Sequence, residues 1–423
     1  MKTKTLLTLA LSAFSFFFAA KASAQDVVTL NTTDSIGVAT WTYTGNNIVV
    51  VIPSGYTNPQ GTNTINALKK LAAGTKVTLR GDGSMPTLAV KTFAVPANLA
   101  SLKFENLTLT GSTTDPTANY IINVATGTAT TLDSVTFNNC NISTFRSLVR
   151  FQSTNTTIDQ KANNITINNC KICNFADYGV VYNNKVGASM GVVKARKSTF
   201  YGFGQNVFLL QTNTTSVDIS DCTFDNVMSV TASKYLVDLS TQVVPVTISN
   251  CILGKTLSTA GSIKTAGTLT ISNTYNTTDW LATAPTATAG LTGAFTAYTG
   301  ASTDLFTSPS TSTPGSSFVN TGISYKIKDA NFTAKNSAGD PRWYYDVTAA
   351  VNSAKSKGIT ITVLDGKIQL SEAANAEIIN ISGKAVKSVT DVQTISTSDL
   401  ATGIYIVKAT NATGSKIQKV VIK

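Results

Sequence analysis

The sequence predicts an all-β fold, a parallel β-helix followed by a small β-domain. A short phrase recurs along the chain and ends at Cys140 (VTFNNC), Cys170 (ITINNC), Cys222 (VDISDC) and Cys251 (VTISNC). Most repeats carry a second strand-like run after a turn, and no segment sustains the period of an α-helix. Self-similarity at a period of about 20 to 50 residues indicates a solenoid, propeller or array. Several short strands in each irregular period favour a parallel β-helix.

One slot of the phrase, usually cysteine, is filled by other residues in some repeats. The aligned copies lie 23 to 33 residues apart and fill this slot with Leu107, Cys140, Cys170, Ser198, Cys222, Cys251 and Thr274. The preceding residue is often an amide or a carboxylate: Asn139, Asn169, Asp221, Asn250 and Asn273. Neighbouring coils of a β-helix lie about 4.8 Å apart, so equivalent side chains stack. We therefore expect a ladder of hydrogen bonds along this turn.

The five cysteines lie between Cys140 and Cys251. Because four of them share the repeated slot, we expect stacked free thiols. A disulfide between Cys140 and Cys170, or between Cys222 and Cys251, is the alternative. The chain has no histidine and no second C-x-x-C beside that of Cys170 and Cys173. We expect no structural metal site and no cofactor.

The N-terminus has the pattern of a secretory signal peptide. Lys2 and Lys4 precede an apolar stretch, and Ala22-Ser23-Ala24 is a cleavage site, so residues 1–24 form the predicted leader. No other segment is apolar enough to cross a bilayer. Residues 25–100 are predicted to form an N-terminal cap and the first coils. An amphipathic helix at Ile65 to Ala72 would cover the open end of the solenoid.

The coil phrases and the preceding helix resemble pectate-lyase-like right-handed parallel β-helix proteins. The resemblance runs from about Asn31 to Leu281, with the β-helix proper at 101–281. It implies a fold and no particular activity. Residues 282–357 are rich in Ala, Thr and Ser, and "TDLF" followed by "NFTAKNSAGDPRW" resembles a tail of Bacteroidetes β-helix proteins of unknown function.

We expect Phe332 and Trp343 of this tail to pack back on the last coils. A glycan platform made of Trp343, Tyr344 and Tyr345 is the alternative.

The last segment, 358–423, is predicted to be a small β-sandwich. Its phrases IINISGK (residues 378–384), LATGIYIV (400–407) and KVVIK (419–423) resemble the C-terminal sorting domain of the type IX secretion system. The resemblance implies contact with that machinery and translocation to the cell surface or the medium. An ordinary β-sandwich binding module is the alternative.

Several function classes are excluded by composition. The formal charge is +11, but no run of Lys and Arg marks a nucleic-acid-binding face. Without histidine, Ser-His-Asp and Cys-His nucleophile systems are impossible. Carboxylates in the coils are sparse and form no close pairs of the kind that glycoside hydrolases use. We expect a monomer that binds polysaccharide.

The second strand of each repeat supplies the candidate binding residues. Alternation turns Arg150 and Asp238 outward, and it places Tyr182, Gln211 and Lys264 on or near the same outer row. The alternative function is a uronate lyase, for which calcium is a candidate cofactor. Its base would be Arg150, or Lys194 or Arg196 from a second basic cluster that also contains Lys197. The simplest interpretation of the same residues is that the outer face of the sheet is polar because it contacts solvent and has no binding function.

Overall fold

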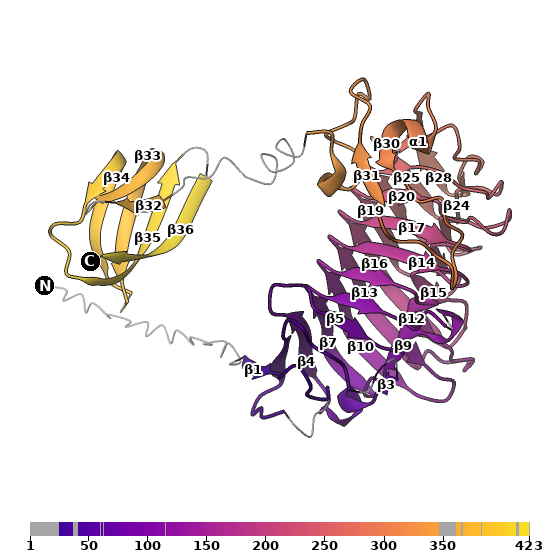
Figure 1. Ribbon diagram of the computed structural model, residues 1–423, viewed down its shortest axis with the longest axis horizontal. Coiled ribbons are helices and arrows are strands. Elements are labelled where there is room, and N and C mark those ends of the chain that lie inside the picture. The colour runs from indigo at the N-terminus through magenta and orange to yellow at the C-terminus, as the bar shows by residue number, and fades with distance from the viewer. Residues whose placement is uncertain are drawn as a thin grey trace, which may run out of the picture.

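The computed structural model describes residues 25–36, 41–59, 61, 63–114, 116–346, 361–364, 367–381, 383–411 and 414–422. The predicted leader lies outside the described residues. The main body contains three parallel sheets, and in each of them the strands follow one another in chain order because successive coils stack (Figure 1). This arrangement is a parallel β-helix. We call these sheets A, B and C.

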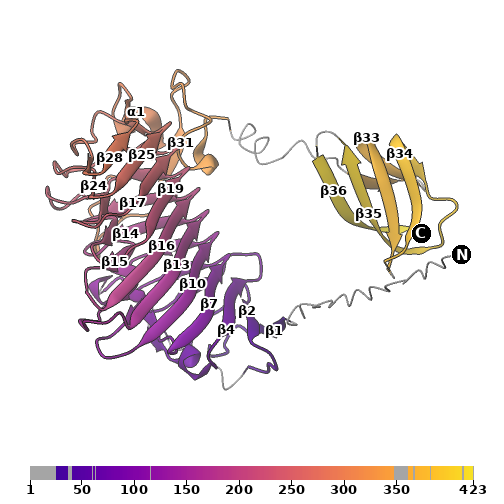
Figure 2. The same ribbon diagram turned by 180° about the vertical axis from the view of Figure 1, so that it is seen from behind.

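Sheet A holds the first strand of each coil and faces the viewer in Figure 2. Its eleven strands are β1 (Asp26–Thr29), β2 (Asn47–Ile52), β4 (Thr75–Gly81), β7 (Asn98–Glu105), β10 (Thr130–Asn138), β13 (Gln160–Asn168), β16 (Ala188–Arg196), β19 (Ser216–Ser220), β22 (Val246–Ser249), β25 (Thr268–Ser272) and β28 (Gly290–Thr292).

Sheet C follows sheet A across the turn that carries the repeated slot. Its nine strands are β5 (Thr87–Ala89), β8 (Thr108–Thr110), β11 (Asn141–Ser143), β14 (Lys171–Phe175), β17 (Thr199–Phe203), β20 (Thr223–Asp225), β23 (Ile252–Leu253), β26 (Tyr275–Asn276) and β29 (Thr296–Ala297).

Sheet B closes each coil. Its nine strands are β3 (Thr64–Ile65), β6 (Thr92–Phe93), β9 (Tyr120–Val124), β12 (Ser147–Phe151), β15 (Val181–Asn183), β18 (Phe208–Leu210), β21 (Val237–Asp238), β24 (Ile263–Thr265) and β27 (Thr286–Ala287). A short 3-10 turn, η3 (Pro116–Ala118), precedes β9.

The interior is a continuous apolar column because equivalent residues of successive coils stack. Phe104 and Phe137 are paired in register and their rings stack at 5.1 Å between centroids. Phe200 and Phe224 stack in the same way at 4.8 Å. Offset stacks of this kind add to the burial of the rings themselves.

The predicted ladder is present at the turn from sheet A to sheet C. Asn139 donates to Asn106 at 2.8 Å and Asn169 donates to Asn139 at 3.0 Å. Further along, Asn250 donates to Asp221 at 3.1 Å and Asn273 donates to Asn250 at 2.9 Å. The five cysteines are buried free thiols, so the alternative of a vertical disulfide is not realised.

The predicted capping helix is wrong in length and in place. Only a single 3-10 turn forms, η2 (Ala67–Lys70), and β1 and β2 extend sheet A beyond it. Ile65 cannot begin a helix because it belongs to β3 and pairs with Phe93 of β6. The expected apolar stripe is nevertheless buried, with Leu68 and Leu71 in the core of the coils.

After the last coil, residues 302–346 run back over the outer face of sheet C, and we call this segment the strap (Figure 1). It contains α1 (Ser302–Leu305), β30 (Phe306–Ser308), β31 (Ser324–Ile327) and the 3-10 turn η4 (Pro341–Trp343). Its apolar side chains share a second core with Cys173, Tyr201 and Ile252 of sheet C. The strap thereby covers a face that would otherwise expose apolar residues.

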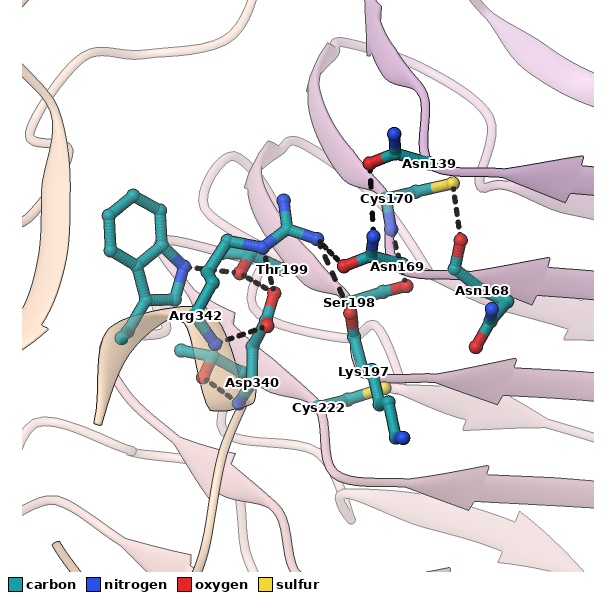
Figure 3. A network of polar contacts seen from close by, with 12 residues as sticks. Asn139, Asn168, Asn169, Cys170, Lys197, Ser198, Thr199, Cys222, Asp340 and Arg342 are labelled. Atoms are coloured by element: carbon teal, nitrogen blue, oxygen red, sulfur yellow. Dashed lines mark hydrogen bonds and ion pairs between the residues drawn. The ribbon is translucent and has the colours of Figure 1, made fainter. Parts of the chain in front are cut away.

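The Asp-Pro-Arg-Trp segment of the strap is fixed to the middle coils (Figure 3). Asp340 accepts from the Thr199 hydroxyl at 2.7 Å and forms an ion pair with Arg342 at 3.1 Å. Trp343 donates from Nε1 to Thr199 at 2.7 Å, whereas Phe332 packs edge-to-face on Tyr275 of the last coils. Trp343 therefore reaches coils farther back than we expected.

A glycan platform of Trp343, Tyr344 and Tyr345 does not form. The Trp343 indole is engaged by Thr199, and Tyr344 is buried with 5% of its surface exposed. Tyr345 alone is exposed. The tail is thus built as a strap, and its aromatic residues serve its attachment.

The C-terminal domain is an antiparallel sheet with its own core. It contains β32 (Ile361–Leu364), β33 (Lys367–Asn380), β34 (Ala385–Ser396), β35 (Gly403–Asn411) and β36 (Gly414–Ile422). Hydrogen bonding joins all five in one sheet, with register shifts along β33. A β-sandwich consists of two packed sheets, whereas these five strands form one sheet, so the predicted sandwich is not confirmed.

Candidate ligand-binding face

The outer face of sheet B carries one row of residues in register. Asn123, Arg150, Tyr182, Leu209, Asp238 and Lys264 are successive partners on neighbouring strands. Strand spacing of about 4.8 Å gives this row a length of roughly 24 Å. Val149, Phe151, Val237 and Leu239 point into the core, as alternation required.

Arginine and tyrosine side chains gather at the N-terminal part of this row. We call Tyr120, Arg146, Arg150, Asp177, Tyr178 and Tyr182 the Arg–Tyr cluster. Both guanidinium groups donate to the Tyr120 hydroxyl, Arg146 at 3.0 Å and Arg150 at 3.1 Å. The rings of Tyr178 and Tyr182 stack at 3.9 Å, and the Arg146 guanidinium lies 3.9 Å from the centre of the Tyr178 ring.

The two arginines differ in how their charge is balanced. Arg146 forms an ion pair with Asp177. Among the described residues Arg150 forms no ion pair, whereas the buried Nε atoms of both arginines lack an acceptor. The Arg150 guanidinium lies 5.2 Å from the centre of the Tyr120 ring and 5.1 Å from that of Tyr178. No carboxylate of the described residues balances the Arg150 charge, so this half-buried guanidinium favours an anionic ligand.

Burial raises the pKa of the Tyr182 phenol to about 12. Burial also raises the pKa of Tyr120, although Arg150 and Arg146 oppose this shift. Both phenols are therefore protonated at neutral pH. Tyr182 is half-buried and keeps a hydroxyl that can donate to a ligand, whereas Tyr120 has only 6% of its surface exposed and offers little of its ring.

A pocket of about 110 Å³ lies beside the cluster, between Tyr178, Tyr182, Leu209 and Lys234. Farther along the row, the prediction that Asp238 points outward is wrong, because only 6% of its surface is exposed and its carboxylate is occupied within the protein. It accepts from Gln211 at 2.8 Å and from the backbone of Ser240 at 3.0 Å. Lys264 lies 5.7 Å from the centre of the Tyr235 ring. The row thus continues with polar and cationic groups beyond the cluster.

The predicted residues divide between two faces. Arg150, Tyr182, Asp238 and Lys264 lie in one row of sheet B, and Gln211 lies beside that row because Leu209 takes its place in the register. Lys194 and Arg196 lie on β16 of sheet A, where Arg196 pairs with Asp218 at 2.6 Å. The structure does not bring this second cluster together with Arg150.

Sequence reasoning missed Tyr120, Arg146, Asp177 and Tyr178. Tyr120 pairs with Ser147 at the start of its strand, Arg146 stands just before that serine, and Asp177 and Tyr178 belong to the turn before β15. An alignment on the beginnings of the second strands, and not only on the cysteine slots, would have found these residues. It would have shown an aromatic or basic residue at or just before the strand in three successive repeats.

Within the described residues, no group of three or more Cys, Asp and Glu side chains is placed to hold a metal ion. No helix in the described part of the chain is long and apolar enough to span a bilayer.

Two family models match the chain. Residues 61–202 match a Domain of unknown function (DUF4957), which covers the coils that carry the Arg–Tyr cluster. Residues 358–423 match the Secretion system C-terminal sorting domain. No curated protein and no solved structure was found to match. The C-terminal segment is thus a sorting domain of the type IX secretion system, and the protein is exported to the cell surface or beyond it.

Proposed function

We propose that this exported β-helix protein binds an acidic polysaccharide along the outer face of sheet B. The observation that carries the proposal is the Arg150 guanidinium, which is partly buried between tyrosine rings and lacks a carboxylate partner among the described residues. A carboxylate of the ligand would pair with it in a charge-assisted hydrogen bond.

The shape of the face supports a polymer as the ligand. A row of roughly 24 Å of stacked strands is longer than one sugar ring. Tyrosine rings, which have an apolar face and a polar hydroxyl, suit the alternating apolar and hydroxylated surfaces of saccharides. Lys264 at the far end adds a second cation on the same row.

The alternative is a uronate lyase in which Arg150 is the base. The proximity of Arg150 to the Tyr120 hydroxyl favours it. Elimination would need Arg150, in its neutral form, to take the C5 proton of the uronate, while the protonated Tyr120 hydroxyl gives a proton to the leaving glycosidic oxygen as the C4–O bond breaks. Lys194 and Arg196 remain the other candidates for the base, on sheet A. Calcium dependence belongs to this alternative.

The test is binding of the purified protein to immobilised polygalacturonate and to a neutral glucan. We expect retention on polygalacturonate and an at least tenfold weaker affinity for the Arg150→Gln variant. Arg196→Gln is the matched control, because it removes the same charge from sheet A. Equal loss in both variants, or no retention of the wild-type protein, would refute the proposed face.

The same samples distinguish a lyase from a binding protein. Ultraviolet absorbance of unsaturated products, followed with and without calcium, would grow with time only in the lyase case. If that signal grows and Arg150→Gln abolishes it, catalysis replaces binding as the function of this face. If Arg196→Gln abolishes it instead, the active site lies on sheet A.

A further inference from the structure

A second pocket lies between the strap and sheet C, away from the Arg–Tyr cluster. Its volume is about 210 Å³. Strands β11, β14 and β17 form one wall with Asn141, Lys171 and Tyr201, and the strap forms the other with Asn320 and Trp343. The pocket therefore exists only where the strap lies on the coils.

The charge of this pocket is unbalanced. Lys171 is the one charged residue among the described residues that line it. None of the ion pairs among the described residues includes Lys171. Burial, and then the positive charge of Arg342, lower the pKa of its ammonium group. A half-buried cation without a counter-ion favours an anionic ligand.

The nearest charged groups of the strap do not supply that counter-ion. The Asp340 carboxylate is held by Arg342 at 3.1 Å and by the Thr199 hydroxyl at 2.7 Å (Figure 3). Arg342 also donates to Asn169 at 2.8 Å. Asp340 and Arg342 thus balance each other, and the pocket keeps the charge of Lys171.

The remaining lining residues describe the rest of the ligand. Trp343 offers an aromatic surface. The Tyr201 hydroxyl donates to the Asn320 amide oxygen at 2.5 Å. The amide nitrogen of Asn320 has no acceptor among the described residues. Asn141 and Ser143 add further polar groups on the opposite wall. Asn320 is exposed.

The size of the pocket limits the ligand to one small ring. Sites for drug-sized molecules usually measure about 300–1,000 Å³, and this pocket is smaller. A cation, an aromatic surface and several amide and hydroxyl groups together fit a hydroxylated ring that bears a carboxylate.

We propose that this pocket binds one acidic sugar unit, a hexuronate, with its carboxylate on Lys171 and its ring against Trp343. The site is separate from the face of sheet B, and either could exist without the other. A free monosaccharide and the end of a longer chain would present the same chemistry to it.

The test measures binding of D-galacturonate to the full-length protein by titration calorimetry, with D-galactose as the matched neutral sugar and acetate as the bare carboxylate. We expect D-galacturonate to bind at least tenfold more tightly than either. Lys171→Met should abolish this preference, and Lys171→Arg, which keeps the charge, should retain most of it. Trigalacturonate shows whether a chain end is accepted as well as the free sugar.

Two further variants keep the result unambiguous. Arg150→Gln should bind D-galacturonate as the wild-type protein does, because it lies on sheet B. Trp343→Phe should weaken binding several-fold, and thermal unfolding of each variant checks that the strap remains folded. Equal affinity for galacturonate and galactose, equal affinity for acetate, no binding at all, or unchanged binding by Lys171→Met would each overturn the proposal.

Discussion

The asparagine before the slot meets two demands at once. Asn106, Asn139, Asn169, Asn250 and Asn273 all have φ between 43° and 55°, the left-handed region that few side chains tolerate. Their amides also bond from coil to coil. Lys197 interrupts the series, and there the guanidinium of Arg342 donates to Asn169 at 2.8 Å and to the Lys197 carbonyl at 3.4 Å (Figure 3). An arginine of the strap therefore replaces the missing step.

Substitution of Asn169 separates these two demands. Asn169→Ala loses the ladder bonds and also strains the turn, so we expect it to lower the free energy of unfolding by about 2–4 kcal/mol. Asn169→Gly loses the same bonds, but glycine tolerates a positive φ. We therefore expect its free energy of unfolding to fall by about 1–2 kcal/mol less than that of Asn169→Ala. Urea unfolding of both variants gives the comparison. Equal losses would show that the turn conformation contributes nothing.

At the scale of elements, the strap is held on sheet C by two buried carboxylates. Asp225 accepts from Ser302 of α1 and from the backbone of Lys255, the latter at 2.7 Å. Asp340 accepts from Thr199. Burial raises the pKa of Asp225 to about 6 and that of Asp340 to about 6, in the second case despite the opposing charge of Arg342.

The sign of the pH dependence follows from these pKa values. Both folded-state pKa values lie above the ordinary aspartate value of 3.8, so the fold favours the protonated carboxyl groups. Their contribution to stability is largest below about pH 4 and is lost as the pH rises to about 6. For each group the loss is roughly 3 kcal/mol, at about 1.4 kcal/mol per pKa unit.

The Asp225→Asn variant cannot ionise and should escape this loss. We expect its free energy of unfolding, relative to that of the wild-type protein, to rise by about 2–3 kcal/mol between pH 4 and pH 7.5. Urea unfolding at four or five pH values measures it. Asp133→Asn, an exposed carboxylate on sheet A, is the control and should show a constant difference. A constant difference for Asp225→Asn as well would contradict the assignment.

The elements also show where sequence reasoning succeeds and where it stops. The coils and the ladder were predictable because a repeated phrase must stack on itself, which gives Asn139 and Asn169 the same neighbours. The structure of the cap was not predictable, because Ile65 becomes part of a strand only by pairing with Phe93, 28 residues farther on. Within the candidate face, alternation placed Arg150 and Tyr182, but Arg146 and Tyr178 lie in the turns before their strands, where no alternation applies.

At the scale of the whole molecule, the chain has separate apolar cores. The core of the β-helix runs from Leu30 to Trp280, and that of the sorting domain from Ile361 to Ile422, with no residue in common. Independent cores allow independent folding.

Calorimetry should therefore show two unfolding transitions. Removal of residues 358–423 should abolish one and shift the midpoint of the other by no more than about 2 °C, because no buried residue of the β-helix core is lost. A control chain lacking 302–346 as well should unfold at a clearly lower temperature, since it exposes the strap-facing surface of sheet C. A single transition that moves on removal of the sorting domain would contradict separate cores.

The sequence alone determined the repeat, the turn ladder and the sorting domain, because each depends on a local pattern that recurs or on a contiguous set of phrases. Only the tertiary structure decided that the Asp-Pro-Arg-Trp segment reaches back to Thr199 and Asn169, more than 140 residues earlier. It also decided that Lys171 lies in a pocket beneath Trp343 and that Arg150 is left without a counter-ion among the described residues. Contacts between distant segments depend on shape and burial across the whole fold, and no local pattern encodes them.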